Sequence, residues 1–250
     1  MTCEACRTIP PVISEGYTPK GTSSTIGDLA FKTYVTGPTD AKTAIVTIYD
    51  IFGNSSQTTQ GADILAQRLN TLVLIPDFFD GDGLDPKCVP PDTDEKMKTL
   101  MGFVQTKAPF EKTAEGIPDL VQAYKGAFPA VEKWAAYGLC WGGKVLALSS
   151  GEGTPWNVTA QVHPGRMDSA DAQTLTIPHA VLASKDEPIE AIQAYDEIIK
   201  AKQLGGFVET YRDMWHGWMG ARADLEKEES LKEYTRGYAQ LAEFFEKYLA

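Results

Sequence analysis

The stretch Trp134-Ala-Ala-Tyr-Gly138-Leu-Cys140-Trp-Gly142-Gly143 decides the fold class of this 250-residue chain. An apolar run typical of a strand leads into Gly-x-Cys-x-Gly-Gly, and a run typical of a helix follows. A sharp strand-to-helix turn of this kind pushes one side chain out above the sheet and crowds the backbone on both sides of it. Gly138 and Gly142 leave the room that this crowding requires. The pattern therefore predicts a nucleophile elbow with Cys140 at its apex, and with it a thiol-dependent hydrolase.

Length and composition are typical of one globular domain. Hydrophobic residues make up 43% of the chain and charged residues 23%, and single α/β domains of this size are common. The formal net charge is −11, without a basic cluster, so we expect no nucleic-acid partner. No apolar run approaches the length of a membrane span, and the first residues lack the apolar segment of a signal peptide. We therefore expect a cytoplasmic protein with no membrane partner.

Strand-like and helix-like runs alternate along the chain. This order favours a single α/β domain over residues 1–250, with a mostly parallel sheet, helices on both faces and an irregular arm over residues 1–21. The expected strands are Thr22–Ile26, Leu29–Thr36, Ala44–Tyr49, Thr71–Ile75, Trp134–Leu139, Val158–Val162, Ala180–Ala183 and Phe207–Tyr211. The expected helices are one capped by Ser55, Asp94–Thr106, Phe110–Phe128, Lys144–Ser150, Ile189–Lys202 and a final helix with an apolar stripe of Tyr234, Tyr238, Leu241, Phe245 and Tyr248.

Four cysteines are too few for a disulfide scaffold in a domain of this size. Cys3 and Cys6 form a Cys-x-x-Cys pair, which needs two further ligands or a strand–helix context to serve a zinc or redox site. The N-terminal sequence offers neither. We expect two thiols on a loosely held arm, and neither a metal nor an organic cofactor.

Two other strand ends carry the groups that a cysteine nucleophile needs. Asp186 follows the strand Ala180–Ala183, and His216 follows the strand Phe207–Tyr211. The order nucleophile, acid, histidine is that of α/β hydrolases. Open α/β sheets place their sites at the carboxyl ends of the strands. We therefore expect Cys140 to attack, His216 to transfer the proton and Asp186 to orient the histidine ring.

Alternatives to these assignments stay open. His163 also stands at the exit of a strand, where it is either a second candidate base or a residue of the pocket. His179 precedes a strand next to Pro178 and is expected to be structural. Glu187 competes with Asp186 as the orienting carboxylate, and Asp213 is a weaker candidate because it lies only a few residues before His216.

Several stretches together resemble the dienelactone hydrolase family of α/β hydrolases. They are Tyr49-Asp-Ile-Phe-Gly53, Ile75-Pro-Asp-Phe-Phe79, Gly138-Leu-Cys-Trp-Gly-Gly143, Lys185-Asp186 and His216-Gly217, and their spacing covers nearly the whole chain after residue 22. The resemblance implies a triad of Cys140, His216 and Asp186. It also implies an oxyanion hole formed by the backbone N–H groups of Ile51 and Trp141. The implied reaction is hydrolysis of a small ester or lactone through an acyl-cysteine.

The expected pocket departs from the family at charged positions. Asp50 stands where the family has a glutamate, and it either holds a proton near Cys140 or hydrogen-bonds within its own loop. The family's arginine after the Phe79 stretch is missing, and Arg222 either clamps a substrate carboxylate or pairs with solvent-side acids. We therefore expect a neutral or aromatic ester or lactone as the substrate. The expected pocket residues are Asp50, Phe52, His163, Trp218 and Arg222, with Trp141, Phe78 and Phe79 as further aromatic candidates.

Two other functions are compatible with the same pattern. A non-catalytic α/β-hydrolase scaffold would bind a small ligand or a protein, because a fold alone does not guarantee activity. An acyltransferase, or a lyase acting on a strained ring, would use the same elbow. The ordered triad favours an enzyme with a small-molecule ester or lactone as its partner, and a homodimer is left open.

Overall fold

The computed structural model describes residues 8–13 and 16–250, so Cys3 and Cys6 lie outside the described residues. Its strands are β1 Thr22–Thr25, β2 Lys32–Thr36, β3 Thr43–Ile48, β4 Leu72–Pro76, β5 Lys133–Leu139, β6 Val158–Val162, β7 His179–Ser184 and β8 Gly206–Tyr211. They form one sheet in the order β1-β2-β4-β3-β5-β6-β7-β8. The β1–β2 and β2–β4 pairs are antiparallel, and all other neighbours are parallel. The predicted, mostly parallel sheet is confirmed, and β1 and β2 form an antiparallel pair at its edge.

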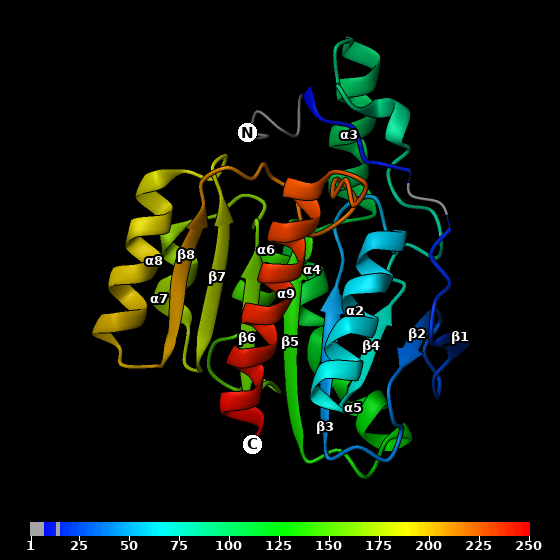
Figure 1. Ribbon diagram of the computed structural model, residues 1–250, viewed down its shortest axis with the longest axis vertical. Coiled ribbons are helices and arrows are strands. Elements are labelled where there is room, and N and C mark those ends of the chain that lie inside the picture. Colours follow the sequence, from blue (N-terminus) through cyan, green and yellow to red (C-terminus); the bar gives the residue numbers. More distant parts are fainter. Residues whose placement is uncertain (1–7, 14–15) are drawn as a thin grey trace.

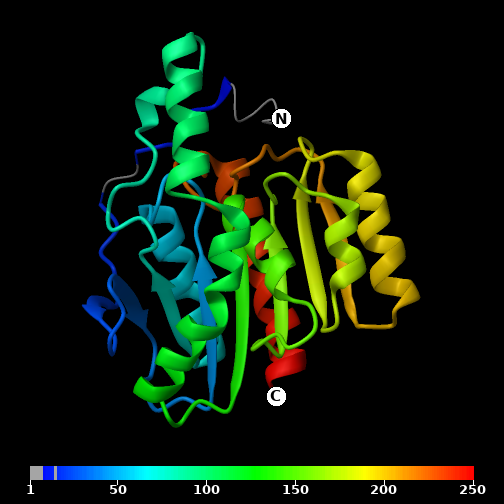
Figure 2. The same ribbon diagram turned by 180° about the vertical axis from the view of Figure 1, so that it is seen from behind.

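Helices cover both faces of this sheet. They are α2 Ser56–Leu69, the 3₁₀ turn η1 Pro86–Cys88, α3 Asp94–Thr106, α4 Phe110–Glu115, α5 Ile117–Ala127, α6 Trp141–Ser149, α7 Ser169–Thr174, α8 Ile189–Ala201 and α9 Glu228–Leu249. Helices α2 and α9 lie on one face, and α4, α5 and α6 lie on the other (Figures 1 and 2). Among the described residues, no helix combines the length and the apolar character that crossing a bilayer requires.

The structure divides one of the predicted helices into two. The expected helix Phe110–Phe128 divides at Gly116 into α4 and α5. Pro118 stands in the first turn of α5, where a helix does not need the N–H that proline lacks. In the middle of a longer helix the same residue would leave a backbone hydrogen bond to the preceding turn unmade. The chain therefore restarts a helix at this point instead of continuing the first one.

Burial explains why the strands were recognisable. Every residue of β4, β6 and β7 is buried, as expected for parallel strands covered on both faces. β4 is apolar throughout, whereas β6 and β7 also contain buried polar residues. The Ser55 side chain accepts a hydrogen bond from the Thr58 N–H at 3.2 Å and caps α2, as predicted. The stripe of α9 also packs into the core, with Tyr234, Tyr238 and Phe245 fully buried.

The amino edge of the sheet contains the histidine that was expected to be structural. His179 opens β7 and is fully buried. Its Nδ1 lies 2.8 Å from the Thr159 hydroxyl, and its Nε2 lies 2.8 Å from Nε2 of Gln161. Both ring nitrogens are thus bound within the core. The other edge, where the parallel strands end, contains the loops of the candidate site, and α3 extends beyond it (Figure 1).

Candidate active site

Cys140 occupies a strained turn between β5 and α6. Its backbone has φ 52° and ψ −106°, a conformation that costs energy for a residue with a side chain. A Cβ on Gly138 would lie 2.1 Å from the Gly142 carbonyl oxygen, and one on Gly142 would lie 2.0 Å from the Ile48 carbonyl oxygen. Both glycines are therefore required by close backbone contact, and the predicted elbow is present.

The elbow is fixed to the loop after β6. The Cys140 N–H donates to the Val162 carbonyl at 3.1 Å, and the Cys140 carbonyl accepts from the Gly165 N–H at 2.8 Å. Helix α6 begins at Trp141, earlier than the predicted Lys144, because the glycines here serve close packing and do not break the helix. The Cys140 side chain is held rigidly above the sheet as a result.

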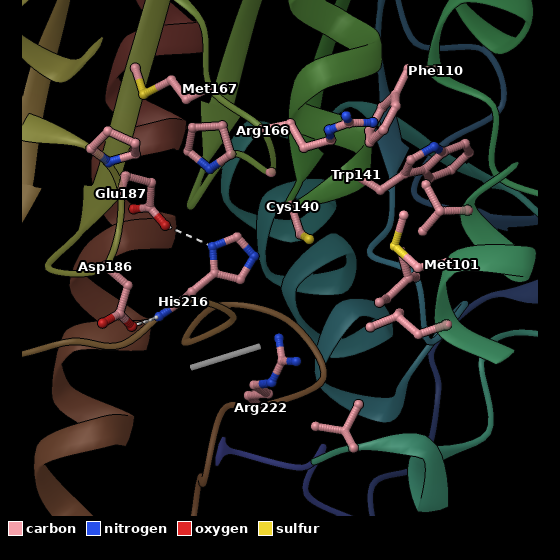
Figure 3. Close-up of a pocket in the computed structure, with 17 residues that line it drawn as sticks. Met101, Phe110, Cys140, Trp141, Arg166, Met167, Asp186, Glu187, His216 and Arg222 are labelled. Carbon is pink, nitrogen blue, oxygen red and sulfur yellow. Dashed lines mark hydrogen bonds and ion pairs between the residues drawn. The ribbon is translucent and has the colours of Figure 1, made fainter. Parts of the chain in front are cut away.

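A cavity of about 550 Å³ opens beside Cys140. Charged and titratable groups line one side of it, and an apolar wall from the segment Val89–Phe110 lines the other. Figure 3 shows His216, Glu187, Asp186 and Arg222 on the first side, with Trp141, Met101 and Phe110 on the second. The cavity can therefore hold a substrate with one polar and one apolar end.

His216 is oriented by Glu187, not by Asp186. Nδ1 of His216 lies 2.7 Å from Oε1 of Glu187, and both side chains are buried. Ser184 fixes this carboxylate, because its backbone N–H donates to Oε2 and its hydroxyl donates to Oε1 at 3.1 Å. The expectation that Asp186 contacts the ring is wrong for this structure, and the alternative carboxylate Glu187 makes the contact.

Asp186 supports the same histidine from its backbone. Its Oδ2 accepts a hydrogen bond from the His216 N–H at 2.8 Å. Its own N–H donates to the Ser184 hydroxyl at 3.2 Å, so the turn after β7 is tied to the Glu187 anchor. Adjacent residues in this turn point in different directions, which is why one carboxylate binds the ring and the other binds the main chain.

Asp50 holds two loops together. Its Oδ1 accepts from the Phe52 N–H at 2.9 Å, and its Oδ2 accepts from the Ala221 N–H at 3.0 Å. Burial raises the pKa of Asp50, and the two backbone hydrogen bonds oppose that rise. Of its two predicted roles, the hydrogen-bonding one is present, and it positions Ile51 at the cavity wall. Ile51 and Trp141 thus both line the cavity with Cys140, as the oxyanion prediction requires.

Arg222 is a buried cation at the cavity. It is 1% exposed, its Nε donates to the Ile9 carbonyl at 2.6 Å, and its guanidinium lies 5.0 Å from the Phe52 ring centre. Its Nη1 and Nη2 have no hydrogen-bond partner among the described residues. Among residues 8–13 and 16–250 no acidic side chain forms a salt bridge with Arg222. The two nitrogens can bind an oxygen-rich or anionic ligand group.

Other predicted pocket residues lie behind the cavity wall. Trp218 is fully buried against Tyr211, with ring centres 4.3 Å apart, and belongs to the core. Phe52 supports Arg222 without lining the cavity, and Phe79 packs against Trp141 at 4.8 Å. His163 is fully buried beside His216, with ring centres 5.1 Å apart, so it is a neighbour of the base and not a wall residue.

Sequence reasoning missed most of the apolar wall and the arginine at its rim. Met101 and Leu100 come from α3, Phe110 opens α4, and the exposed Arg166 follows β6 over the Phe110 ring. The apolar positions of α3 were visible in the sequence, but nothing local shows where a helix docks. Within the described part of the chain, no group of three or more His, Cys, Asp or Glu side chains is arranged to hold a metal.

Comparisons with known proteins agree with this architecture. The model of the dienelactone hydrolase family matches residues 31–249. An uncharacterised AIM2 family protein of Schizosaccharomyces pombe is 35% identical over 216 residues, which cover 86% of each chain. The crystal structure of a dienelactone hydrolase from Anabaena variabilis matches with a TM-score of 0.65 at 12% identity, over 93% of this chain and 99% of that one. The dienelactone hydrolase-like promiscuous phosphotriesterase P91, from metagenomic libraries, matches with a TM-score of 0.61 at 19% identity, over 91% and 98%. At these identities the structural matches show the fold alone.

Proposed function

The chain belongs to the dienelactone hydrolase family, and from this premise we propose that it hydrolyses a small ester or lactone through an acyl-cysteine. One observation carries the proposal. A cysteine in a strained elbow lines the same cavity as a buried histidine whose ring is held by a carboxylate. Nucleophile, base and orienting group are the parts that covalent acyl transfer needs.

The proposed reaction begins with proton transfer from the Cys140 thiol to His216. The thiolate attacks the carbonyl carbon, and the resulting oxyanion accepts hydrogen bonds from the N–H groups of Ile51 and Trp141. The carbon–oxygen bond of the ester then breaks. His216 returns its proton to the leaving alkoxide, and an acyl-cysteine remains.

Water completes the cycle. His216 takes a proton from a water molecule, which attacks the thioester carbon, and the Cys140 sulfur leaves as the thiolate. Glu187 serves as the third member of the proposed triad, because it binds Nδ1 of His216 and stabilises the imidazolium formed in each step. Asp186 holds the backbone of the base. The mechanism needs a reduced thiol, which favours the cytoplasmic location proposed above.

Arg222 sharpens the proposed substrate class. Its Nη1 and Nη2, which have no hydrogen-bond partner in the described part of the chain, and the apolar wall favour an ester or lactone with an oxygen-rich or anionic group near the reacting carbonyl and an apolar body beyond it. This proposal differs from the neutral substrate that the sequence favoured. The difference follows from the burial of Arg222, which no local sequence pattern indicates.

A single assay tests the proposed function. Wild type and Cys140→Ala are incubated with aryl esters, lactones and thioesters, and acylated Cys140 is sought by mass spectrometry. We expect turnover and transient acylation in the wild type only. Equal turnover in the two proteins would rule out the cysteine mechanism, and neither turnover nor acylation across the panel would favour a binding scaffold.

A further inference from the structure

His163 lies beside the proposed base, and the proposed mechanism does not use it. It follows β6 at the carboxyl edge, and its backbone has φ 37°, a conformation that is strained for a residue with a side chain. It is fully buried. Neither ring nitrogen has a hydrogen-bond partner among residues 8–13 and 16–250. Backbone strain and unsatisfied buried nitrogens both lower the stability of the fold. A functional role therefore explains the presence of a histidine here better than a structural role does.

The contact of His163 with His216 shows what that function can be. The ring centres are 5.1 Å apart and the ring planes meet at 66°, an edge-to-face arrangement that aromatic pairs prefer. His163 does not line the cavity, and no part of it is exposed. His163 thus has no surface on the cavity, and its ring contact with His216 is the route by which we infer that it acts on the reaction.

The charged groups around His216 limit which side chain can occupy position 163 beside it. Glu187 binds His216 at Nδ1, Cys140 and Arg222 line the cavity with it, and the Asp50 carboxylate acts on it electrostatically. Burial, followed by the charges of His216 and Arg222, holds the pKa of His163 well below its usual range. The ring is therefore neutral, and it can pack against His216 without placing a second cation next to the imidazolium.

We propose that His163 is a positioning residue, whose ring packs against His216 and keeps that ring in the orientation that serves Cys140. The inference rests on the proposed function, because it assumes that His216 takes the proton of the thiol. Glu187 holds the His216 ring at Nδ1. The edge-to-face contact with His163 adds a steric constraint on the tilt of that ring, and we infer that it helps to keep Nε2 directed to one place in the cavity.

Alkylation of Cys140 by iodoacetamide across a pH range tests the proposal without a known substrate. The rate at Cys140 is followed by peptide mass spectrometry, because Cys88 is also a free thiol. Wild type is compared with three variants. His163→Phe keeps the ring, His163→Leu removes it, and His163→Asn removes it while tolerating the positive φ.

The rate at Cys140 in His163→Leu and His163→Asn should be about tenfold lower than in the wild type near pH 6.5, because a misdirected His216 takes the thiol proton less readily. His163→Phe should stay within about threefold of wild type at every pH. A lower amount of folded protein would reduce the yield of alkylated peptide but would not change the rate constant of the folded fraction.

Other outcomes separate the two proposals. A wild-type rate at Cys140 in a folded His163→Leu or His163→Asn protein would overturn the positioning role and leave the cysteine mechanism intact. A rate that falls in His163→Phe as far as in the ring-less variants would also overturn it, because the nitrogens and not the ring would then matter. A wild-type Cys140 that reacts near pH 6.5 no faster than free cysteine would count against the proposed function.

Discussion

Two buried histidines at opposite edges of the sheet differ in the hydrogen bonding of their ring nitrogens. His179 opens β7 at the amino edge, and both of its ring nitrogens are bound to neighbouring side chains. His163 follows the adjacent strand β6 at the carboxyl edge, and neither of its nitrogens has a partner among the described residues. Both rings are fully buried. Burial alone therefore does not distinguish them, whereas satisfaction of their polar atoms does.

Further energetic costs surround His163. At the carboxyl edge, Cys140, His163 and Arg166 all have positive φ, and Arg222 keeps two buried nitrogens without a hydrogen-bond partner among the described residues. Such costs persist where the surrounding structure enforces them, and they cluster at functional sites. We expect substitutions at the carboxyl edge to change activity more than stability, and substitutions at the amino edge to do the reverse.

The largest effect on activity is expected at Glu187. Glu187→Gln presents an amide to Nδ1 of His216, favours the wrong ring tautomer and removes the charge that stabilises the imidazolium. We expect kcat on an accepted aryl ester to fall by on the order of 10³- to 10⁴-fold. The unfolding transition in urea should change much less, because the amide still fills the same space.

Asp186→Asn is the matched control for this prediction. Its amide oxygen can still accept the His216 N–H, so kcat should fall by less than about tenfold. The reverse ranking of the two variants would return the orienting role to Asp186. It would also show that the turn after β7 rearranges when a substrate binds.

The amino edge should respond through stability. His179→Leu leaves the Thr159 hydroxyl and the Gln161 amide without their ring partner, so we expect the free energy of unfolding to fall by about 2 to 4 kcal/mol. The kcat of the folded fraction should stay within about twofold. Urea denaturation and active-site titration measure the two quantities. Unchanged stability would contradict the comparison, as would a large loss of stability in His163→Leu.

Acid should narrow the stability difference between wild type and His179→Leu. Burial lowers the pKa of His179 to about 3, whereas an unfolded histidine titrates near 6.5. Between these values the unfolded chain binds a proton that the folded chain does not, so this residue lowers wild-type stability by about 1.4 kcal/mol per pH unit as pH falls. At pH 5 the difference should be about 2 kcal/mol smaller than at pH 7. A difference that is independent of pH would show that the ring binds its proton equally well in the folded and unfolded chains, which would contradict a lowered pKa in the fold.

Sequence patterns anticipated the sheet better than they anticipated the site. Strands such as β6 can be predicted because both of their faces are buried. The elbow can be predicted because close backbone contacts require glycine at positions 138 and 142. Choosing between Asp186 and Glu187 depends on how one turn directs adjacent side chains, which residue order does not encode. Helix α7, Ser169–Thr174, is too short and polar to show a period. The cavity wall depends on where α3 docks, and that contact joins segments far apart in the chain.

A smaller effect on activity than that of Glu187→Gln is expected in a comparison of two arginines at one cavity. Arg222 is buried, and two of its nitrogens have no hydrogen-bond partner within residues 8–13 and 16–250, whereas Arg166 is exposed at the rim. A charge-assisted hydrogen bond in a buried site is worth about 1.5 to 3 kcal/mol, while water and salt screen an exposed charge. Arg222→Gln should therefore lower kcat/KM for 4-nitrophenyl hemisuccinate by about 10- to 100-fold and change neutral 4-nitrophenyl butyrate by less than about threefold. Arg166→Gln should change both substrates by less than about threefold. If Arg166→Gln discriminated between the two esters and Arg222→Gln did not, the anionic group would bind at the rim, and the unsatisfied nitrogens at the carboxyl edge would need an explanation other than substrate recognition.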